Sequence, residues 1–197
     1  AYVLNVSPDA PELDLFAGDQ ELADGLGFGE LAGPVSLAAG SAVLDLFPSQ
    51  AGAARPAAAP AASVSIGELA SGKTYLIVAS GYFAAGRSPA LTVAAVAEEF
   101  RVLNPLLARL RAVNASPDTP TVALAAKTET ERLVPIPDLA ALSYLRPSSA
   151  EGAVLPPQVL TLGLLPVGQR EARAELDVDL TGRPRAFGVI AGLSSPS

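Results

Sequence analysis

The chain contains no cysteine, no histidine, no methionine and no tryptophan among its 197 residues. Without cysteine there is no disulfide framework, so the sequence does not indicate an oxidising or a reducing compartment. Without histidine and cysteine the commonest general base, the thiol nucleophile and the usual zinc ligands are all missing. Catalysis would have to come from carboxylates, from Ser with Lys, or from Tyr, and no known catalytic motif is present. We therefore predict that the protein is not an enzyme and has neither catalytic residues nor a cofactor.

Basic residues and long apolar runs are also scarce. Lys and Arg number 13 against 20 Asp and Glu, which gives a net charge of −7 and a pI of about 4.6. Affinity for nucleic acid comes largely from Lys and Arg that neutralise phosphates, so no nucleic-acid partner is expected. Pro, Gly or a charged residue interrupts every apolar stretch, so no membrane span is expected either. Hydrophobic residues still make up 50% of the chain, which is ample for a core and excludes general disorder.

The first residue is Ala1 rather than Met. Small residues flank signal-peptidase cleavage sites, so this start fits a processed precursor, although a chain trimmed at Ala1 for another reason would look the same. We expect an extracellular or cell-surface location after removal of a signal peptide.

A sequence repeat divides the chain. Asn5-Val-Ser-Pro-Asp-Ala-Pro11 returns as Asn114-Ala-Ser-Pro-Asp-Thr-Pro120, an offset of 114 − 5 = 109 residues. The segment 72–81 returns as 182–192, at an offset of 110 that drifts to 111 (182 − 72 and 192 − 81). Collinear matches at a nearly constant offset indicate a duplication. We predict two domains, at residues 1–100 and 101–197.

Apolar and polar residues alternate within each copy, and Gly, Pro or Ser closes each alternating run, as in short β-strands. Residues 105–113 also show helical spacing, but their alignment with the first strand of copy one favours a strand. The sequence therefore predicts an all-β protein of two tandem β-sandwich domains. The predicted strands are 2–6, 12–16, 43–47, 64–69, 74–80 and 89–96 in copy one, and 106–113, 121–125, 143–145, 159–162, 172–178 and 186–191 in copy two.

Two segments of low complexity interrupt these strands. Residues 51–62 are rich in Ala and Pro, and residues 146–158 are rich in Pro and Ser. Proline lacks the N–H that a β-ladder needs, so both segments are predicted to be long surface loops at nearly matching places in the two copies.

Three motifs of copy one carry a family resemblance: Ser7-Pro-Asp-Ala-Pro-Glu-Leu-Asp-Leu15, Leu37-Ala-Ala-Gly40 and Gly72-Lys-Thr-Tyr75. Together they resemble a bacterial family known only as domain of unknown function 4397. Copy one matches over nearly its full length, whereas copy two matches well at Ser116–Pro120 and weakly afterwards. The resemblance implies tandem immunoglobulin-like or transthyretin-like sandwiches on secreted or cell-surface proteins, and it implies no activity.

The chain departs from that family at one position in each copy. The family commonly has His just before the Ala-Ser-Pro-Asp run, where this chain has Asn5 and Asn114. Any titration or metal binding by that His is therefore absent from this protein.

The Ser-Pro-Asp-x-Pro motif is the sharpest local feature. Ser7 and Asp9 can accept hydrogen bonds from nearby backbone N–H groups while the two prolines fix φ, which makes a rigid corner. The alternative is a calcium corner built from Asp9, Glu12 and Asp14, because Ca²⁺ takes six to eight oxygen ligands. Copy two has Thr121 and Ala123 where copy one has Glu12 and Asp14. This difference favours a scaffold and leaves the three carboxylates as weak metal candidates.

The two copies also end differently. Copy one continues into an alternating segment at 89–96, whereas copy two ends at residue 197 without an equivalent. A sandwich without its last strand exposes unpaired backbone groups, which a strand from another subunit could complete. The alternative is a truncation whose edge is covered by loops. We predict an assembly edge formed by Ala186, Phe187, Val189, Ile190 and Leu193.

The favoured interpretation is a non-enzymatic, exported structural protein of the cell surface. It would self-assemble through sheet edges, as a filament or surface-layer-like subunit, with itself or other surface proteins as partners. The alternative is a ligand-binding or adhesive module for carbohydrate, which usually needs aromatic platforms. The tyrosines available for this purpose are Tyr2, Tyr75, Tyr82 and Tyr144.

Overall fold

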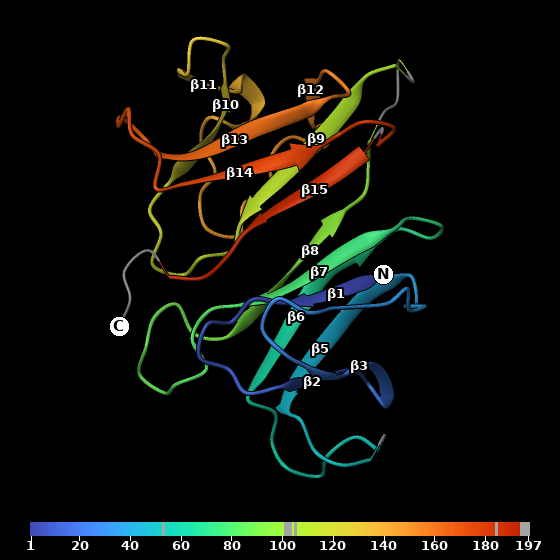
Figure 1. Ribbon diagram of the computed structural model, residues 1–197. Helices are drawn as coiled ribbons and strands as arrows, with labels where there is room; N and C mark the ends of the chain where they lie inside the picture. The colour runs from blue at the N-terminus through green and yellow to red at the C-terminus, as the bar shows by residue number, and fades with distance from the viewer. Residues whose placement is uncertain (53, 101–103, 105, 184, 194–197) are drawn as a thin grey trace. The chain divides into compact units, whose positions relative to one another are not determined.

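The fold was analysed in a computed structural model that describes residues 1–52, 54–100, 104, 106–183 and 185–193. Its strands form four sheets (Figure 1), and a 3₁₀ turn, η1 (Pro137–Leu139), is the one helical element among these residues. No helix in the described ranges has the length and apolar character to cross a membrane. The predicted all-β class is confirmed.

Contacts between Cα atoms divide the chain into two compact units. Unit 1 comprises Ala1–Glu98, Ala115–Pro117 and Ala191–Ser197, and unit 2 comprises Glu99–Asn114 and Asp118–Ile190. The predicted boundary after residue 100 adjoins residues 101–103, which lie outside the described residues.

Unit 1 contains two four-stranded sheets. One has the order β4-β1-β7-β8, with β1 (Tyr2–Asn5), β4 (Leu31–Ala32), β7 (Tyr75–Ser80) and β8 (Thr92–Ala97). The other has the order β3-β2-β5-β6, with β2 (Leu13–Ala17), β3 (Gln20–Leu26), β5 (Gly40–Pro48) and β6 (Ala62–Leu69). Strands β1 and β7 run parallel, and the other pairs are antiparallel.

Alternate residues of these strands build the core of unit 1. Ile77 and Ala79 of one sheet pack against Leu15 and Leu44 of the other, in a single cluster of buried side chains. Because the pleat places every second side chain on one face, the alternation in the sequence becomes a sandwich.

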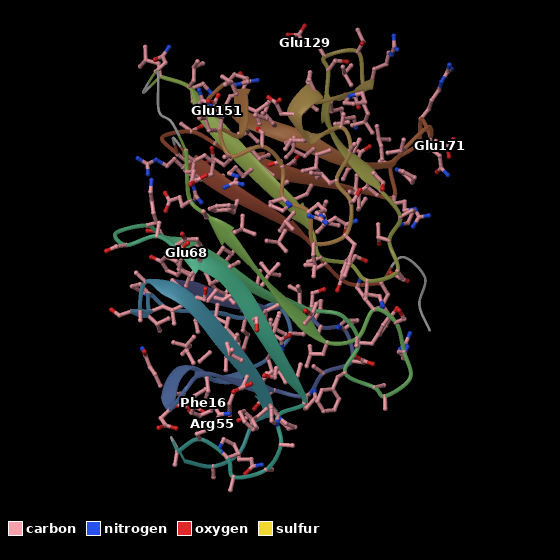
Figure 2. All side chains as sticks on the ribbon, turned by 180° about the vertical axis from the view of Figure 1, so that it is seen from behind. Phe16, Arg55, Glu68, Glu129, Glu151 and Glu171 are labelled. Carbon is pink, nitrogen blue, oxygen red and sulfur yellow. The ribbon has the colours of Figure 1, made fainter. Side chains whose placement is uncertain are left out.

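The loop from β5 to β6 covers the other face of the second sheet. Phe16 and Phe47 meet edge to face there, with ring centroids 5.7 Å apart. The guanidinium of Arg55 lies 5.4 Å from the Phe47 centroid and pairs with Asp45 at 2.6 Å. Figure 2 labels Phe16 and Arg55 at the same end of the unit. Hydrogen bonding from Ser63, together with Arg55, lowers the pKa of Asp45. The described residues between 51 and 61 lie outside any strand, as predicted, whereas Ala62 begins β6 (Ala62–Leu69). Arg55 holds this loop to the sheet.

Unit 2 contains a three-stranded and a four-stranded sheet. The first has the order β12-β9-β15, with β9 (Ala108–Asn114), β12 (Ala153–Leu155) and β15 (Arg185–Ile190). The second has the order β11-β10-β13-β14, with β10 (Val122–Lys127), β11 (Leu133–Pro135), β13 (Val159–Pro166) and β14 (Ala174–Asp179). Leu110 of the first sheet and Leu162 of the second belong to one buried cluster, which makes this unit a sandwich as well.

The strand register repeats between the two halves of the chain. In the parallel pairs, Asn5 lies opposite Ala79 and Asn114 lies opposite Ile190. In the antiparallel pairs, Leu13 lies opposite Pro48. Likewise, Val122 lies opposite Pro166. Strand β9 therefore corresponds to β1, β15 to β7, β10 to β2, and β13 to β5.

The prediction for residues 146–158 was wrong in two ways. The segment lies before β13, whereas the loop at 51–62 follows β5, the counterpart of β13. It also contains β12, which pairs with β9. Ala153 and Leu155 are buried and Val154 between them is exposed, so three alternating residues suffice for a strand that the flanking prolines conceal. Residues 143–145, predicted as a strand, form only isolated bridges.

Substitution of Gly81, in the turn after β7, can test how tightly this turn packs. Gly81 has φ +94°, and a Cβ there would overlap the carbonyl oxygen of Ala90. We expect Gly81→Ala to lower the free energy of unfolding by more than about 2 kcal/mol, because both strain and overlap result. Gly86 in the same connection has φ +81° and open space around it. Gly86→Ala should therefore cost only about 1 kcal/mol. Urea denaturation compares the two variants, and equal losses would contradict this assignment.

Candidate functional site

The Ser-Pro-Asp-x-Pro corner joins the first strand of each repeat to the turn after its parallel partner. Ser7 is fully buried, and its Oγ donates a hydrogen bond to the carbonyl oxygen of Gly81 at 2.7 Å. In the second repeat, the Oγ of Ser116 donates to the carbonyl oxygen of Gly192, also at 2.7 Å. Asn5 is buried beside the corner and donates from Nδ2 to the carbonyl oxygen of Leu26 at 2.9 Å. These side chains are occupied in holding the backbone.

Asp9, a candidate metal ligand from the sequence, is engaged with a loop. Its Oδ1 accepts a hydrogen bond from the backbone N–H of Phe83 at 2.7 Å, and its Oδ2 accepts one from Ala84 at 3.3 Å. Arg87 lies 3.7 Å from Oδ2 and stacks over the ring of Tyr82. Asp9 thus holds the connection between β7 and β8.

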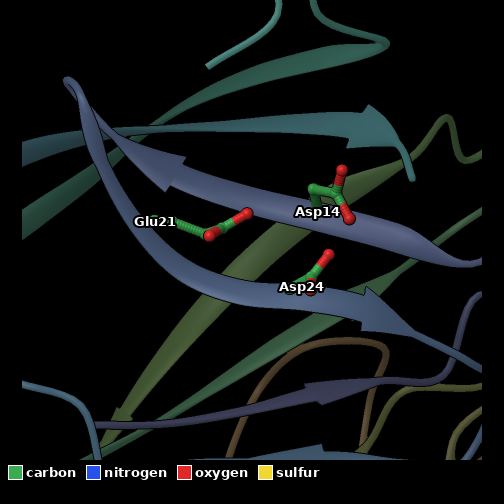
Figure 3. A group of neighbouring side chains, drawn as sticks. All are labelled: Asp14, Glu21 and Asp24. Atoms are coloured by element: carbon green, nitrogen blue, oxygen red, sulfur yellow. The ribbon is translucent and has the colours of Figure 1, made fainter. Parts of the chain in front are cut away.

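Asp14 gathers with two other carboxylates, Glu21 and Asp24 of β3 (Figure 3), rather than with Asp9 and Glu12. One oxygen from each of the three lies within 4.8 Å of the others. Asp14 is only 2% exposed, and its two oxygens accept hydrogen bonds from the backbone N–H groups of Gly25 at 2.9 Å and Gln50 at 3.0 Å. This carboxylate therefore connects β2 to the end of β3 and to the loop after β5.

Glu21 is the member of the carboxylate cluster that has a buried oxygen, Oε1, without a hydrogen-bond partner among the described residues. Burial, followed by the negative charges of Asp24 and Asp14, raises the pKa of Glu21 above its ordinary value of 4.5. Three carboxylates in this arrangement could offer oxygens to a hard cation such as Ca²⁺. The second repeat has Ala123 at the position of Asp14 in the strand register, so the cluster belongs to the first repeat alone.

Sequence reasoning named Asp14 but missed Glu21 and Asp24, because it did not predict β3. That strand carries the polar residues Gln20, Glu21 and Asp24, and its register against β2 is interrupted by bulges. The signal available was the Gly18-Asp19 turn, which the structure shows to be followed by a strand that returns beside β2.

The outer edge of β15 is the main difference between the two repeats. Strand β7 lies between β1 and β8, whereas among the described residues β15 has a paired strand, β9, on one side only. Ala186 and Ile190 are half-buried and pack against the core cluster of unit 2. Phe187 points to the opposite face, where its ring lies 5.2 Å from that of Phe100. Leu193, the last predicted edge residue, lies beyond the end of β15 and is half-buried.

Strand β14 of unit 2 also differs from its counterpart in unit 1. Leu176 lies opposite the buried Leu162, so both side chains face inwards, yet Leu176 is 68% exposed. The same register places Val64 of β6 at this position in unit 1. Val64 is partly buried against the cluster that includes Val93 of β8, and β6 and β8 are in contact. Among the described residues, no strand covers the inward side of Leu176 at the place where β8 lies in unit 1.

A family model described as Domain of unknown function (DUF4397) matches residues 1–125, which span the first repeat and the start of the second. No curated protein matches the chain. No solved structure matches it either.

The carboxylate cluster makes a prediction about pH. The raised pKa of Glu21 means that the folded state favours its protonated form, so this contribution to stability is complete below pH 4.5 and is lost as the pH rises through the folded-state pKa. We expect Glu21→Gln to raise the free energy of unfolding at pH 7 by up to about 1 kcal/mol, because the neutral amide removes both the cost of burying a charge and the repulsion from Asp24 and Asp14. The gain should disappear near pH 4. Urea denaturation at both pH values measures it.

Glu68 of β6 provides the matched control, because its side chain is exposed to solvent. We expect Glu68→Gln to change the stability little at either pH. A Glu21→Gln variant that is less stable than the wild type at pH 7 would contradict the role assigned to repulsion.

Proposed function

Because the chain belongs to the family described as Domain of unknown function (DUF4397), whose description assigns no activity, we propose a function from the open edge of unit 2. The protein is a non-enzymatic structural protein, exported to the cell surface or the extracellular medium. It assembles with copies of itself through the edge of β15. The observation that carries this proposal is that, within the part of the chain the structure describes, residues 186–190 of β15 lie beside a paired strand on one side only, next to the exposed, inward-facing Leu176.

The chemistry of β15 favours pairing with another strand. An unpaired edge presents a row of backbone N–H and C=O groups to any passing chain. Natural edges are commonly protected by charged residues or by proline. Strand β14, the edge of the other sheet in this unit, carries Glu175, Asp177 and Asp179. Residues 186–190 of β15 contain neither charge nor proline.

The acidic surface supports association at this edge rather than elsewhere. Glu68, Glu129 and Glu171 are exposed and labelled in Figure 2. The chain as a whole carries a charge of −7. A net charge of one sign keeps proteins apart in solution. Because residues 186–190 carry no charge, two β15 strands can pair along this stretch without repulsion between charges on the strands themselves.

The carbohydrate-binding alternative gains no support from Tyr82. This residue is only 6% exposed, and the guanidinium of Arg87 lies 3.7 Å above its ring. The ring face that would stack on a sugar is therefore already covered. Tyr75 is also engaged, since its hydroxyl accepts a hydrogen bond from the backbone N–H of Ala70 at 2.8 Å.

Self-association can be tested with a charge beside the open edge. We expect the wild type to sediment as concentration-dependent oligomers and Leu176→Lys to remain monomeric, because an ammonium group would have to be buried under the incoming strand. Since Leu176 is 68% exposed, its replacement should change monomer stability by no more than about 0.5 kcal/mol. Sedimentation velocity and electron microscopy measure assembly, and thermal unfolding measures stability.

The matched control is Val159→Lys. Val159 is 61% exposed and lies on the neighbouring strand β13. It directly precedes the buried Leu160, so its side chain lies on the opposite face of the strand, away from the core. We expect this variant to assemble like the wild type. A wild type that stays monomeric at every concentration, or a Leu176→Lys variant that assembles normally, would refute the proposal.

A further inference from the structure

The pairing of β7 with β8 shows how this edge is closed in unit 1. Ile77 lies opposite Ala95, and Ala79 lies opposite Val93. All four side chains belong to the core cluster of the unit. A large residue therefore faces a small one at each of the two central inward positions. Such size matching across strands fills the core without overlap.

Strand β15 has a small residue where β7 has a large one, and a large residue where β7 has a small one. The register against the first strand of each repeat places Gly188 at the position of Ile77, and Ile190 at the position of Ala79. A Cβ on Gly188 would lie 3.7 Å from the Cβ of Ala112 and 3.7 Å from Cδ1 of Leu110, so this position also faces the core. A strand that closes unit 2 must therefore bring a large residue opposite Gly188 and a small residue opposite Ile190.

The strand β15 of a second copy meets this requirement. In an antiparallel pair centred on Val189, Ile190 of each copy lies opposite Gly188 of the other. Both residues keep their inward face, because a twofold axis perpendicular to a sheet leaves its two faces unchanged. We propose that two copies pair through β15 in this register and join their three-stranded sheets into one. This inference rests on the proposed function and names the partner and the register.

The same register accounts for the apolar surface left open on β14. Ile190 of the second copy takes the place that Ala95 holds in unit 1. Ala95 and Val64 belong to one cluster there, and Leu176 stands at the position of Val64. The incoming isoleucine thus enters the layer in which Leu176 is uncovered. Residues 186–190 bring no charge into this layer, so no ion has to be desolvated on pairing.

A double-mutant cycle on β15 tests the register. Gly188→Ile alone places isoleucine opposite isoleucine twice in each pair, and Ile190→Ala alone leaves two gaps. We expect each single variant to raise the dissociation constant of the pair by at least about tenfold, through overpacking in one case and cavities in the other. The double variant carries isoleucine at 188 and alanine at 190, the order found in unit 1. It should recover affinity to within about threefold of the wild type.

The full chain is used throughout, with sedimentation equilibrium for affinity and thermal unfolding for the fold of each monomer. The double variant keeps the test decisive if one single variant folds poorly, since a random loss of fold is not repaired by a second substitution. Recovery in the double variant supports the register. Single variants that associate like the wild type, or a double variant weaker than both, overturn the register but leave self-assembly standing. A strictly monomeric wild type overturns the proposed function itself, and the register with it.

Discussion

The fold of each repeat depends on a parallel pairing between its first strand and a strand near its end. A parallel pair cannot be closed by a tight turn, so the chain between the two strands must cross over from one end of the pair to the other, and here that connection contains most of the other strands of the sandwich. The hydroxyl of Ser7 connects the end of β1 to Gly81, and Ser116 makes the same connection to Gly192. The motif most visible in the sequence thus joins two segments that lie far apart in the sequence of each repeat.

Much of this arrangement could be predicted from the residues because it rests on local patterns. Alternation predicted β2, a short apolar run closed by Ser80 and Gly81 predicted β7, and the repeated motif located β9 despite the helical spacing of its leading residues. The fold class, the duplication and the loop after β5 follow from patterns of this kind. They are consequences of side-chain period and turn chemistry, which a single sequence contains.

The features that escaped prediction depend on contacts between distant residues. Strand β3 places Leu22, Ala23 and Leu26 in the core, but its pairing with β2 is bulged, so its sequence lacks a regular alternation. The carboxylate cluster follows from that pairing, because Glu21 and Asp24 approach Asp14 only when the two strands lie side by side. Strand β12 is three residues long and flanked by proline, so its pattern is too short to be distinguished from a loop. The exposure of the inward-facing Leu176 became visible only from the register of β14.

The hydrogen bond between Ser7 and Gly81 also bears on the order in which parts of the protein can fold. The residues that it joins are 74 positions apart, and those of the second repeat are 76 apart. Contacts of such long range form late, because the entropy of closing the loop must be overcome before they stabilise anything. During synthesis, each first strand therefore remains without its parallel neighbour until nearly the whole repeat has emerged.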